Sequence, residues 1–310
     1  MSSTAPTILV VGASGFIGGE FTKRLEGNGF GCRKIVRQAR NLDEFQVDFD
    51  WPLDDPRWIA VFEGIEVVIH LIGNSNESDP NLFNINVGYT ERVARLAGLF
   101  RINRLIYVSS IKAVKTTNSH VKSSVEGISQ ALSCYGRSKL MAERVLKNIC
   151  IKSGVEYVIV RPPPVYGPGG KGGINKLIWL ATHRFPIPYL DSNSVSSILA
   201  VTNLCDFLEL CMHNPRAANK TFSVRDNRLY TFRELICDIE ISSGKKPFLV
   251  KLPSMFFRLL KLIPPLRRSL EKYERQLVID NTLVRSELDW VPKVDMKFEL
   301  ERMMGGGKLR

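Results

Sequence analysis

A glycine-rich turn near the N-terminus restricts the possible folds of this chain more than any other segment. The apolar run "TILVVGA" leads into "GASGFIG", so Gly12, Gly15 and Gly18 fall between a predicted strand and a predicted helix. Glycines there permit close backbone approach, and the helix start offers N–H groups and positive potential to a pyrophosphate. The spacing is GxxGxxG rather than GxGxxG, so the prediction of a dinucleotide site rests on the flanking strand and helix. A plain tight turn is the alternative.

Apolar runs and helical patterns alternate through the first half of the chain. Several of the runs are apolar throughout, which is typical of parallel strands covered on both faces. The predicted strands are residues 7–13, 32–37, 67–72, 104–110 and 157–162. Strands that alternate with helices predict an α/β fold, built on a doubly wound parallel sheet of the Rossmann type.

The Pro/Gly-rich segment "RPPPVYGPGGKGG" predicts a boundary between two lobes. Residues 1–162 are expected to form a dinucleotide-binding Rossmann domain, and residues 163–310 a smaller, mixed α/β substrate-binding lobe. Residues 198–213 are predicted to return to the first lobe as a strand and a helix.

The charge and the composition exclude several classes of function. With 43 basic and 31 acidic residues the net charge is +12, which suits an anionic partner. Basic residues are not interleaved with aromatics, so a phosphorylated small molecule is favoured over nucleic acid. Six cysteines without a CxxC pair and four histidines without metal spacing predict free thiols and no metal. The start lacks the pattern of a signal peptide and no long apolar run follows, so a cytoplasmic protein is expected.

The end of the second predicted strand bears on the choice of nicotinamide. An acidic residue there usually accepts hydrogen bonds from the ribose of NAD, whereas "KIVRQAR" offers Arg37 and no acid. A guanidinium can pair with a 2′-phosphate, which favours NADP(H) over NAD(H). Stacking of Arg37 on the adenine, or exposure to solvent, is the alternative. Asp50 or Asp48 in "VDFDW" is a candidate adenine contact, with capping as the other interpretation.

Three later residues have the order and spacing of an acid–base site. Ser110 ends the fourth predicted strand, Tyr135 follows 25 residues later, and Lys139 lies one helical turn beyond Tyr135. A phenol has a pKa of ~10, and a nearby ammonium lowers it. We expect Tyr135 to move the proton, Lys139 to tune it and to bind the nicotinamide ribose, and Ser110 to hold the reacting oxygen. Taken alone, YxxxK is weak evidence, and a solvated pair on a helix surface is the safer interpretation.

The chain resembles the extended short-chain dehydrogenases/reductases of the NAD-dependent epimerase/dehydratase family. The resemblance covers nearly the whole length and rests on "GASGFIG", "VVIHLIG", "NINVGYT", "YVSSIKAV", "YGRSK", "RPPPVYGPG" and "ELDWVP". It implies a catalytic triad of Ser110, Tyr135 and Lys139. The cofactor contacts that it implies are Gly12, Ser14, Gly15, Phe16, Ile17, Gly18, Leu71, Ile72, Gly73, Asn86 and Pro162. Asn86 matches a central-helix asparagine, although "NVGYT" displaces the glycine of the usual NVxGT.

The same resemblance implies an activity. "SSIKAV" and "RPPPVYGPGGKGG" are closest to members that act on nucleotide-activated sugars in surface-polysaccharide synthesis. The leading hypothesis is NADPH-dependent reduction of a 4-keto sugar on a nucleoside-diphosphate or diphosphate-lipid carrier, and Arg37 is the main reason to prefer reduction. An NAD-dependent sugar 4-epimerase is the alternative, and a non-catalytic Rossmann scaffold is a third hypothesis. A homodimer is implied as well.

The substrate side departs from the family pattern. Nucleotide-sugar members carry an arginine for the diphosphate where Ser196 stands here, and loss of such a contact costs about 1.5–3 kcal/mol. Lys171, Lys176 or Arg275 is expected to substitute, and Pro164 is a candidate substrate contact. Residues 252–276 are apolar and carry Arg258, Lys261, Arg267 and Arg268, which suits the inner face of an anionic membrane. A helix pair packed inside the substrate lobe is the favoured interpretation.

Overall fold

The computed structural model describes residues 7–114, 120–121, 133–183, 185–189, 194–246, 248–251, 255 and 277–305. Arg275 and, apart from Met255, the apolar segment 252–276 lie outside the described residues. Within the described ranges, every helix is too short or too polar to span a bilayer.

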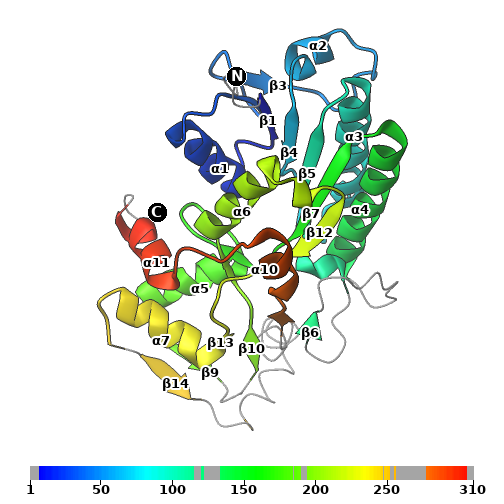
Figure 1. The fold of residues 1–310 in the computed structure, drawn as a ribbon. Coiled ribbons are helices and arrows are strands. Elements are labelled where there is room, and N and C mark those ends of the chain that lie inside the picture. The colour runs from blue at the N-terminus through cyan, green and yellow to red at the C-terminus, as the bar shows by residue number, and fades with distance from the viewer. Residues whose placement is uncertain are drawn as a thin grey trace.

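A seven-stranded sheet in the order β12-β7-β5-β4-β1-β2-β3 forms the centre of the molecule (Figure 1). Every neighbouring pair in it is parallel. The strands are β1 (Ile8–Val11), β2 (Cys32–Val36), β3 (Glu44–Gln46), β4 (Val67–His70), β5 (Arg104–Val108), β7 (Glu156–Arg161) and β12 (Lys220–Ser223). Because the strand order reverses between β1 and β4, a crevice is expected at their carboxyl ends. This confirms the predicted doubly wound parallel sheet.

Helices cover both faces of the sheet (Figure 1). One face packs against α1 (Phe16–Gly27) and α6 (Val201–His213), and the other against α2 (Arg57–Phe62), α3 (Tyr89–Leu99) and α4 (Cys134–Ser153). Strand β1 shows why both faces must be covered. Ile8 and Val10 are buried in one hydrophobic cluster, and Leu9 and Val11 are buried in the other.

Two strands of the sheet have no counterpart among the predicted runs. β3 ("EFQ") and β12 ("KTFS") are short and largely polar, so neither gives an apolar run. Residues 198–213 do contain a strand and a helix. The strand β11 (Leu199–Ala200) pairs with β8 (Val165–Tyr166) in a separate two-stranded sheet, and both Leu199 and the buried residues of α6 belong to the core cluster beside the large sheet.

The second lobe surrounds a smaller core. Its cluster of buried residues includes Tyr166, Ile178, Ile239 and Leu300, and it mixes helices with short strands. The helices are α5 (Gly173–Thr182), α7 (Phe232–Ser242) and α11 (Met296–Gly305), and the strands are β8, β9 (Ile187–Tyr189), β10 (Val195–Ser196), β11, β13 (Tyr230–Thr231) and β14 (Leu249–Lys251). The remaining elements are β6 (His120–Val121), β15 (Val278–Ile279), α10 (Thr282–Leu288), the π-helix η1 (Asn84–Gly88), and the 3-10 helices η2 (Ile111–Ala113) and η3 (Pro215–Ala217).

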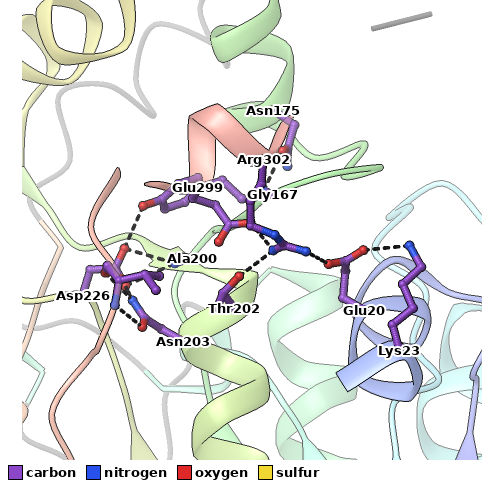
Figure 2. A network of polar contacts seen from close by, with 12 residues as sticks. Glu20, Lys23, Gly167, Asn175, Ala200, Thr202, Asn203, Asp226, Glu299 and Arg302 are labelled. Atoms are coloured by element: carbon purple, nitrogen blue, oxygen red, sulfur yellow. Dashed lines mark hydrogen bonds and ion pairs between the residues drawn. The ribbon is translucent and has the colours of Figure 1, made fainter. Parts of the chain in front are cut away.

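A polar network ties the last helix to the first. Arg302 of α11 pairs with Glu20 of α1 at 2.5 Å, and it also donates to Glu299 at 2.9 Å and to Thr202 at 2.5 Å (Figure 2). Glu299 is fully buried and Glu20 is nearly so. Helix α11 therefore lies between α1 and α7 and connects the helix that follows the glycine turn with the second lobe (Figure 1).

Candidate active site

The glycine turn is a backbone cradle at the end of β1. The N–H groups of Gly12 and Ala13 both donate to the carbonyl of Ile35, at 3.0 and 3.1 Å, and Gly12 has a φ of +92° that favours glycine. A Cβ at Gly18 would lie 2.8 Å from the Cα of Ala13 and closer still to the carbonyl oxygen of Gly12. Ser14 and Gly15 are exposed at the tip, and no side chain caps α1. The exposed start of this helix can therefore face an anion.

The loop after β4 joins the glycine turn to the predicted lysine. A Cβ at Gly12 would lie 3.0 Å from the side chain of Ile72, and a Cβ at Gly73 would lie 2.9 Å from Nζ of Lys139. Leu71 packs against the core cluster that contains Ile8 and Val10. Leu71, Ile72 and Gly73 thus lie between the turn and the ammonium group.

The structure brings Ser110 and Tyr135 together. Ser110 follows β5 and accepts a hydrogen bond from the backbone N–H of Lys112 at 3.2 Å, and its side chain is hydrogen-bonded to Tyr135. Ser133 caps α4, which sets the start of the helix that carries Tyr135. Ser110 and Tyr135, which are 25 positions apart in the sequence, therefore form one hydrogen-bonded pair beside the edge of the sheet.

The electrostatics of Tyr135 differ from the expectation. Burial raises the pKa of the Tyr135 phenol, and the hydrogen bond with Ser110 acts in the opposite direction. The lowering expected from Lys139 is not found, because the ammonium of Lys139 contacts Tyr107 instead, at 3.0 Å. Nζ of Lys112 lies 5.4 Å from the centre of the Tyr135 ring.

Lys139 lies inside the protein. Its ammonium donates to the phenolic oxygen of Tyr107 at 3.0 Å and to the carbonyl of Val108 at 3.1 Å. Burial lowers the pKa of Lys139 to about 7, and the carboxylate of Glu143 acts against this lowering. Charged and neutral forms of this lysine are therefore both populated near neutral pH.

Asn86 is buried and locked in place by its neighbours. Its side chain accepts from the backbone N–H of Asn74 at 2.7 Å, and donates to the carbonyl of Asn74 and to Ser138 Oγ, each at 2.8 Å. It lies on the π-helix η1, a wide turn that is frequent at functional sites. The displaced glycine of "NVGYT" is Gly88, where a Cβ would lie 2.5 Å from Oδ1 of Asn84. The close approach of Asn84 accounts for a glycine at this position.

The basic residues near the end of β2 have different roles. Arg33 donates to the carbonyls of Val61 and Glu63, and Lys34 pairs with Glu26 and Asp43. Arg37 is exposed directly after the strand, so it is the cation at the predicted ribose end.

The two aspartates of "VDFDW" also differ. Asp48 accepts a hydrogen bond from the backbone N–H of Asp50 at 2.9 Å, which is the turn-capping role. Asp50 is exposed and lines a surface hollow of about 260 Å³ with residues of η1.

Only some of the residues predicted from position 162 onward lie near Ser110. The carbonyl of Pro162 accepts from the N–H of Ile111 at 3.0 Å, so Pro162 lies beside the serine, and the carbonyl of Pro164 accepts from the N–H of Leu199 at 3.2 Å. Lys171 and Lys176 are exposed on the glycine-rich loop and on α5. Ser196 forms a bridge to Leu277, the second residue after Arg275 in the sequence.

Several buried polar residues near this site were missed from the sequence. Arg161 and Glu143 form a buried ion pair, and Ser109 donates to Glu143 at 2.5 Å. Glu143 follows Lys139 by four residues, so the helical period could have indicated it. Tyr107, by contrast, stands inside an apolar strand, where an aromatic residue gives no functional signal.

Comparison with known proteins identifies the family. A model of the NAD dependent epimerase/dehydratase family matches residues 8–224. The chain belongs to this family of enzymes. The UDP-glucose 4-epimerase of Vibrio cholerae is 26% identical over 315 residues, which cover 92% of this chain and 90% of that protein. The N-acetyl-alpha-D-glucosaminyl-diphospho-ditrans,octacis-undecaprenol 4-epimerase of Escherichia coli O157:H7 is 24% identical, with 80% and 74% covered.

The solved structures agree with this membership at the level of the fold. UDP-glucuronic acid 4-epimerase from Bacillus cereus, solved in complex with NAD, superimposes with a TM-score of 0.72. The match covers 96% of this chain and 94% of that one, at 17% identity. The fold of the present chain, including the sheet and the second lobe, is therefore similar to the fold of that epimerase.

Proposed function

We propose that this chain is a nicotinamide-dependent 4-epimerase of a diphosphate-linked sugar. The observation that carries the proposal is the hydrogen-bonded pair of Ser110 and Tyr135, next to a buried Lys139 and a glycine cradle. Relatives that match most of the chain, and whose names denote 4-epimerases of nucleotide- and lipid-linked sugars, support the substrate class. Because of these relatives we now prefer epimerisation to reduction, which the sequence alone favoured.

The residues of the turn fit a dinucleotide. The glycines let the turn pack tightly, since a Cβ at Gly18 would collide with the backbone of the turn and one at Gly12 would press on Ile72. The exposed and uncapped start of α1 at Ser14 and Gly15 is left for the pyrophosphate. We assign the pyrophosphate to the turn and the nicotinamide ribose to the surroundings of Lys139; the residues involved are Gly12, Ser14, Gly15, Phe16, Ile17 and Gly18, and then Leu71, Ile72, Gly73, Asn86 and Pro162. When bound, the nicotinamide supplies reversible hydride transfer.

Tyr135 then serves as the acid and the base. As the phenolate it takes the proton of the sugar hydroxyl when the carbon is oxidised, and as the phenol it returns that proton when the carbon is reduced again on the other face. Ser110 holds the same oxygen through its hydroxyl. Burial raises the pKa of the Tyr135 phenol, which favours the protonated form that returns the proton to the keto oxygen, while the hydrogen bond with Ser110 favours the phenolate that the oxidation step needs.

Reduction with NADPH is the second candidate, and Arg37 is the observation that favours it. Arg37 is exposed where an acid would otherwise meet the ribose of NAD. The nucleotide released by denaturing the purified protein separates the two candidates. Tightly retained NAD supports the epimerase, whereas an empty site that exchanges NADPH supports the reductase.

The decisive assay measures the C4 stereochemistry of the product. UDP-glucose, UDP-N-acetylglucosamine and a polyprenyl-diphosphate N-acetylglucosamine are each incubated with the protein and NAD, and the sugars are then separated. We expect a C4 epimer of at least one of them. Conversion that requires stoichiometric NADPH and a 4-keto substrate, with no epimer formed, would reject epimerisation.

The diphosphate is proposed to meet Lys171 or Lys176, since Ser196 has no charge, and Arg275 is a third candidate in the sequence. Replacement of the responsible cation by alanine should raise KM and leave kcat nearly unchanged. If each of the three alanine variants keeps the KM of the wild type, this assignment fails.

A further inference from the structure

A row of buried polar side chains lies behind Lys139, and the proposed reaction leaves it without a role. Tyr107 of β5, Thr90 of α3 and His70 of β4 are each completely buried. His70 and Tyr107 are register partners in the pairing of β4 with β5, and their rings stack at 5.2 Å with an interplanar angle of 20°. The phenol of Tyr107 is therefore held by the sheet and by the imidazole below it.

The chemistry of these groups fixes the direction of each hydrogen bond. An ammonium can only donate, so the oxygen of Tyr107 accepts from Lys139 at 3.0 Å. The hydroxyl of Tyr107 is also hydrogen-bonded to Thr90, and Thr90 itself donates to the backbone carbonyl of Asn86 at 2.7 Å. Tyr107 must then donate to Thr90. An ordered row of donors runs from Lys139 through Tyr107 and Thr90 to Asn86.

His70 completes the row from the other side. Its Nε2 lies 2.9 Å from Oγ1 of Thr90, whose own proton is already given to Asn86. Nε2 must therefore carry the proton, and Nδ1 is left without it and without a hydrogen-bond partner among the residues that the structure describes. Burial, and then the charge of Lys139, lower the pKa of His70 to about 3, so this imidazole stays neutral and places no second cation next to the ammonium.

The groups that surround the ammonium of Lys139 show why the hydrogen bond to Tyr107 matters. The groups around its ammonium are Tyr107 and Val108 of β5, Glu143 of α4, and the neutral His70 of β4. Glu143 is itself shared with Arg161 of β7 and with Ser109. The ammonium of Lys139 thus donates to a neutral side chain, the hydroxyl of Tyr107. That hydroxyl is in turn oriented by its hydrogen bond to Thr90.

We propose that Tyr107 is a positioning residue of the active site, which holds the ammonium of Lys139 toward the cofactor loop and is itself oriented by Thr90. The inference rests on the proposed function of Lys139 at the nicotinamide ribose. Without the hydroxyl of Tyr107 the charged form of Lys139 loses an acceptor in a dry site, whereas the neutral form loses less. Proton loss from Lys139 then occurs at lower pH, and the lysine is free to leave its place beside Gly73.

The test combines direct titration of the lysine with steady-state kinetics. Tyr107→Phe keeps the ring and its stacking on His70 and removes only the hydroxyl. Lysines labelled with ¹³C at Cε are titrated by NMR, and the Lys139 signal is assigned by its loss in Lys139→Met. In Tyr107→Phe we expect the Lys139 titration to move down by about one pH unit, and kcat at pH 7 to fall about 10-fold with the substrate KM within about two-fold.

Thr90 supplies a matched pair of variants. Thr90→Val removes the acceptor of the Tyr107 hydroxyl and should shift the titration in the same direction, whereas Thr90→Ser keeps the hydroxyl and should behave as the wild type. Tyr157→Phe, at the amino end of β7, removes a hydroxyl remote from the site and controls for the substitution itself. If Tyr107→Phe fails to fold, the comparison of Thr90→Val with Thr90→Ser decides alone.

The outcomes separate this inference from the proposed function. An unmoved Lys139 titration in Tyr107→Phe, or an unchanged kcat over the whole pH range, overturns the positioning role. A fall in kcat that is equal at every pH, without a shift in the titration, also overturns it, because that result indicates a structural effect. The titration needs no substrate, so it stays decisive even if the sugar assays reject epimerisation.

Discussion

Arg161 and Glu143 form a buried bidentate ion pair, in which Nε of Arg161 lies 2.9 Å from Oε1 of Glu143 and Nη2 lies 2.5 Å from Oε2. The side chains are 7% and 2% exposed, and Ser109 donates to the same carboxylate. The pair joins α4, one turn after Lys139, to the ends of β5 and β7. The helix that carries both proposed acid–base residues is therefore anchored from within the sheet.

Removing one partner of this pair should be costly. Glu143→Leu leaves the guanidinium of Arg161 buried without its carboxylate, and we expect the free energy of unfolding to fall by about 3–5 kcal/mol. The double variant Glu143→Leu/Arg161→Met removes both charges and should recover part of that loss. Urea unfolding of the single and double variants measures it. A double variant no more stable than Glu143→Leu would contradict a net cost of the unpaired charge.

The buried ammonium of Lys139 should make stability depend on pH. The folded-state pKa is lowered to about 7 from the ordinary value near 10.5, so the unfolded chain binds more protons between these values. The free energy of unfolding therefore gains a contribution that rises with pH from about 7 to 10.5. Lys139→Met should stabilise the unliganded protein most below pH 7, and the advantage should shrink toward pH 10.

The control for this titration is Lys152→Met, which changes an exposed lysine on the same helix. Unfolding in urea at pH 6, 8 and 10 gives the stability difference of each variant from the wild type. The Lys152→Met difference should be the same at all three values. A Lys139→Met difference that is equally independent of pH would show that the lysine is not buried in its charged state.

Two adjacent glycines offer a test of the nucleotide cradle. A Cβ at Gly18 would lie 2.8 Å from the Cα of Ala13, whereas a Cβ at Gly19 would meet only the carbonyl of Ala13, at 3.8 Å. Gly18→Ala should abolish NAD(H) and NADP(H) binding in a calorimetric titration. Gly19→Ala should bind within about three-fold of the wild type and should gain about 0.5–1 kcal/mol of stability from its place in a helix. Equal loss in both variants would mean that the turn does not hold the nucleotide through its backbone.

Tyr135→Phe should separate chemistry from binding. The ring remains and the proton is lost, so we expect kcat to fall by about 10²–10⁴ while the nucleotide Kd stays within about two-fold. Single-turnover rates and calorimetry measure the two effects. Ser110→Ala is expected to lose less, because it removes an orienting hydrogen bond rather than the proton donor. Turnover unchanged in Tyr135→Phe would assign the acid–base role to another group.

The sequence predicted the parts of the fold that depend on local pattern. The continuous apolar runs of β1, β4 and β5 indicated strands buried on both faces, and the glycine turn indicated the carboxyl edge at which they meet. β12 could not be predicted in the same way, because "KTFS" becomes a strand only by pairing with β7. Its position in the sheet depends on a partner far away in the sequence.

For the candidate site, too, the sequence indicated the features that depend on local spacing and not those that depend on distant strands. Spacing indicated that Ser110 and Tyr135 would meet, since one ends a strand and the other opens the next helix. The direction of Lys139 was not indicated, because it depends on the register of β4 with β5 that stacks Tyr107 on His70. The expected influence of Lys139 on Tyr135 was therefore replaced by contact with a tyrosine that no motif singles out.

The last residues of the chain have a consequence for its biosynthesis. Val284, Leu288 and Trp290 belong to the core cluster that also contains β1 and α1, where Trp290 packs on Phe207 of α6, and Arg302 makes the contact with Glu20. The core beside the large sheet therefore cannot be completed during synthesis until these residues have emerged from the ribosome. Closure over so large a sequence separation is slow, and the exposed apolar surface invites chaperones in the meantime. Ribosome-bound chains that end before Val284 should remain sensitive to protease within α1 and α6, and become protected once Arg302 has left the exit tunnel.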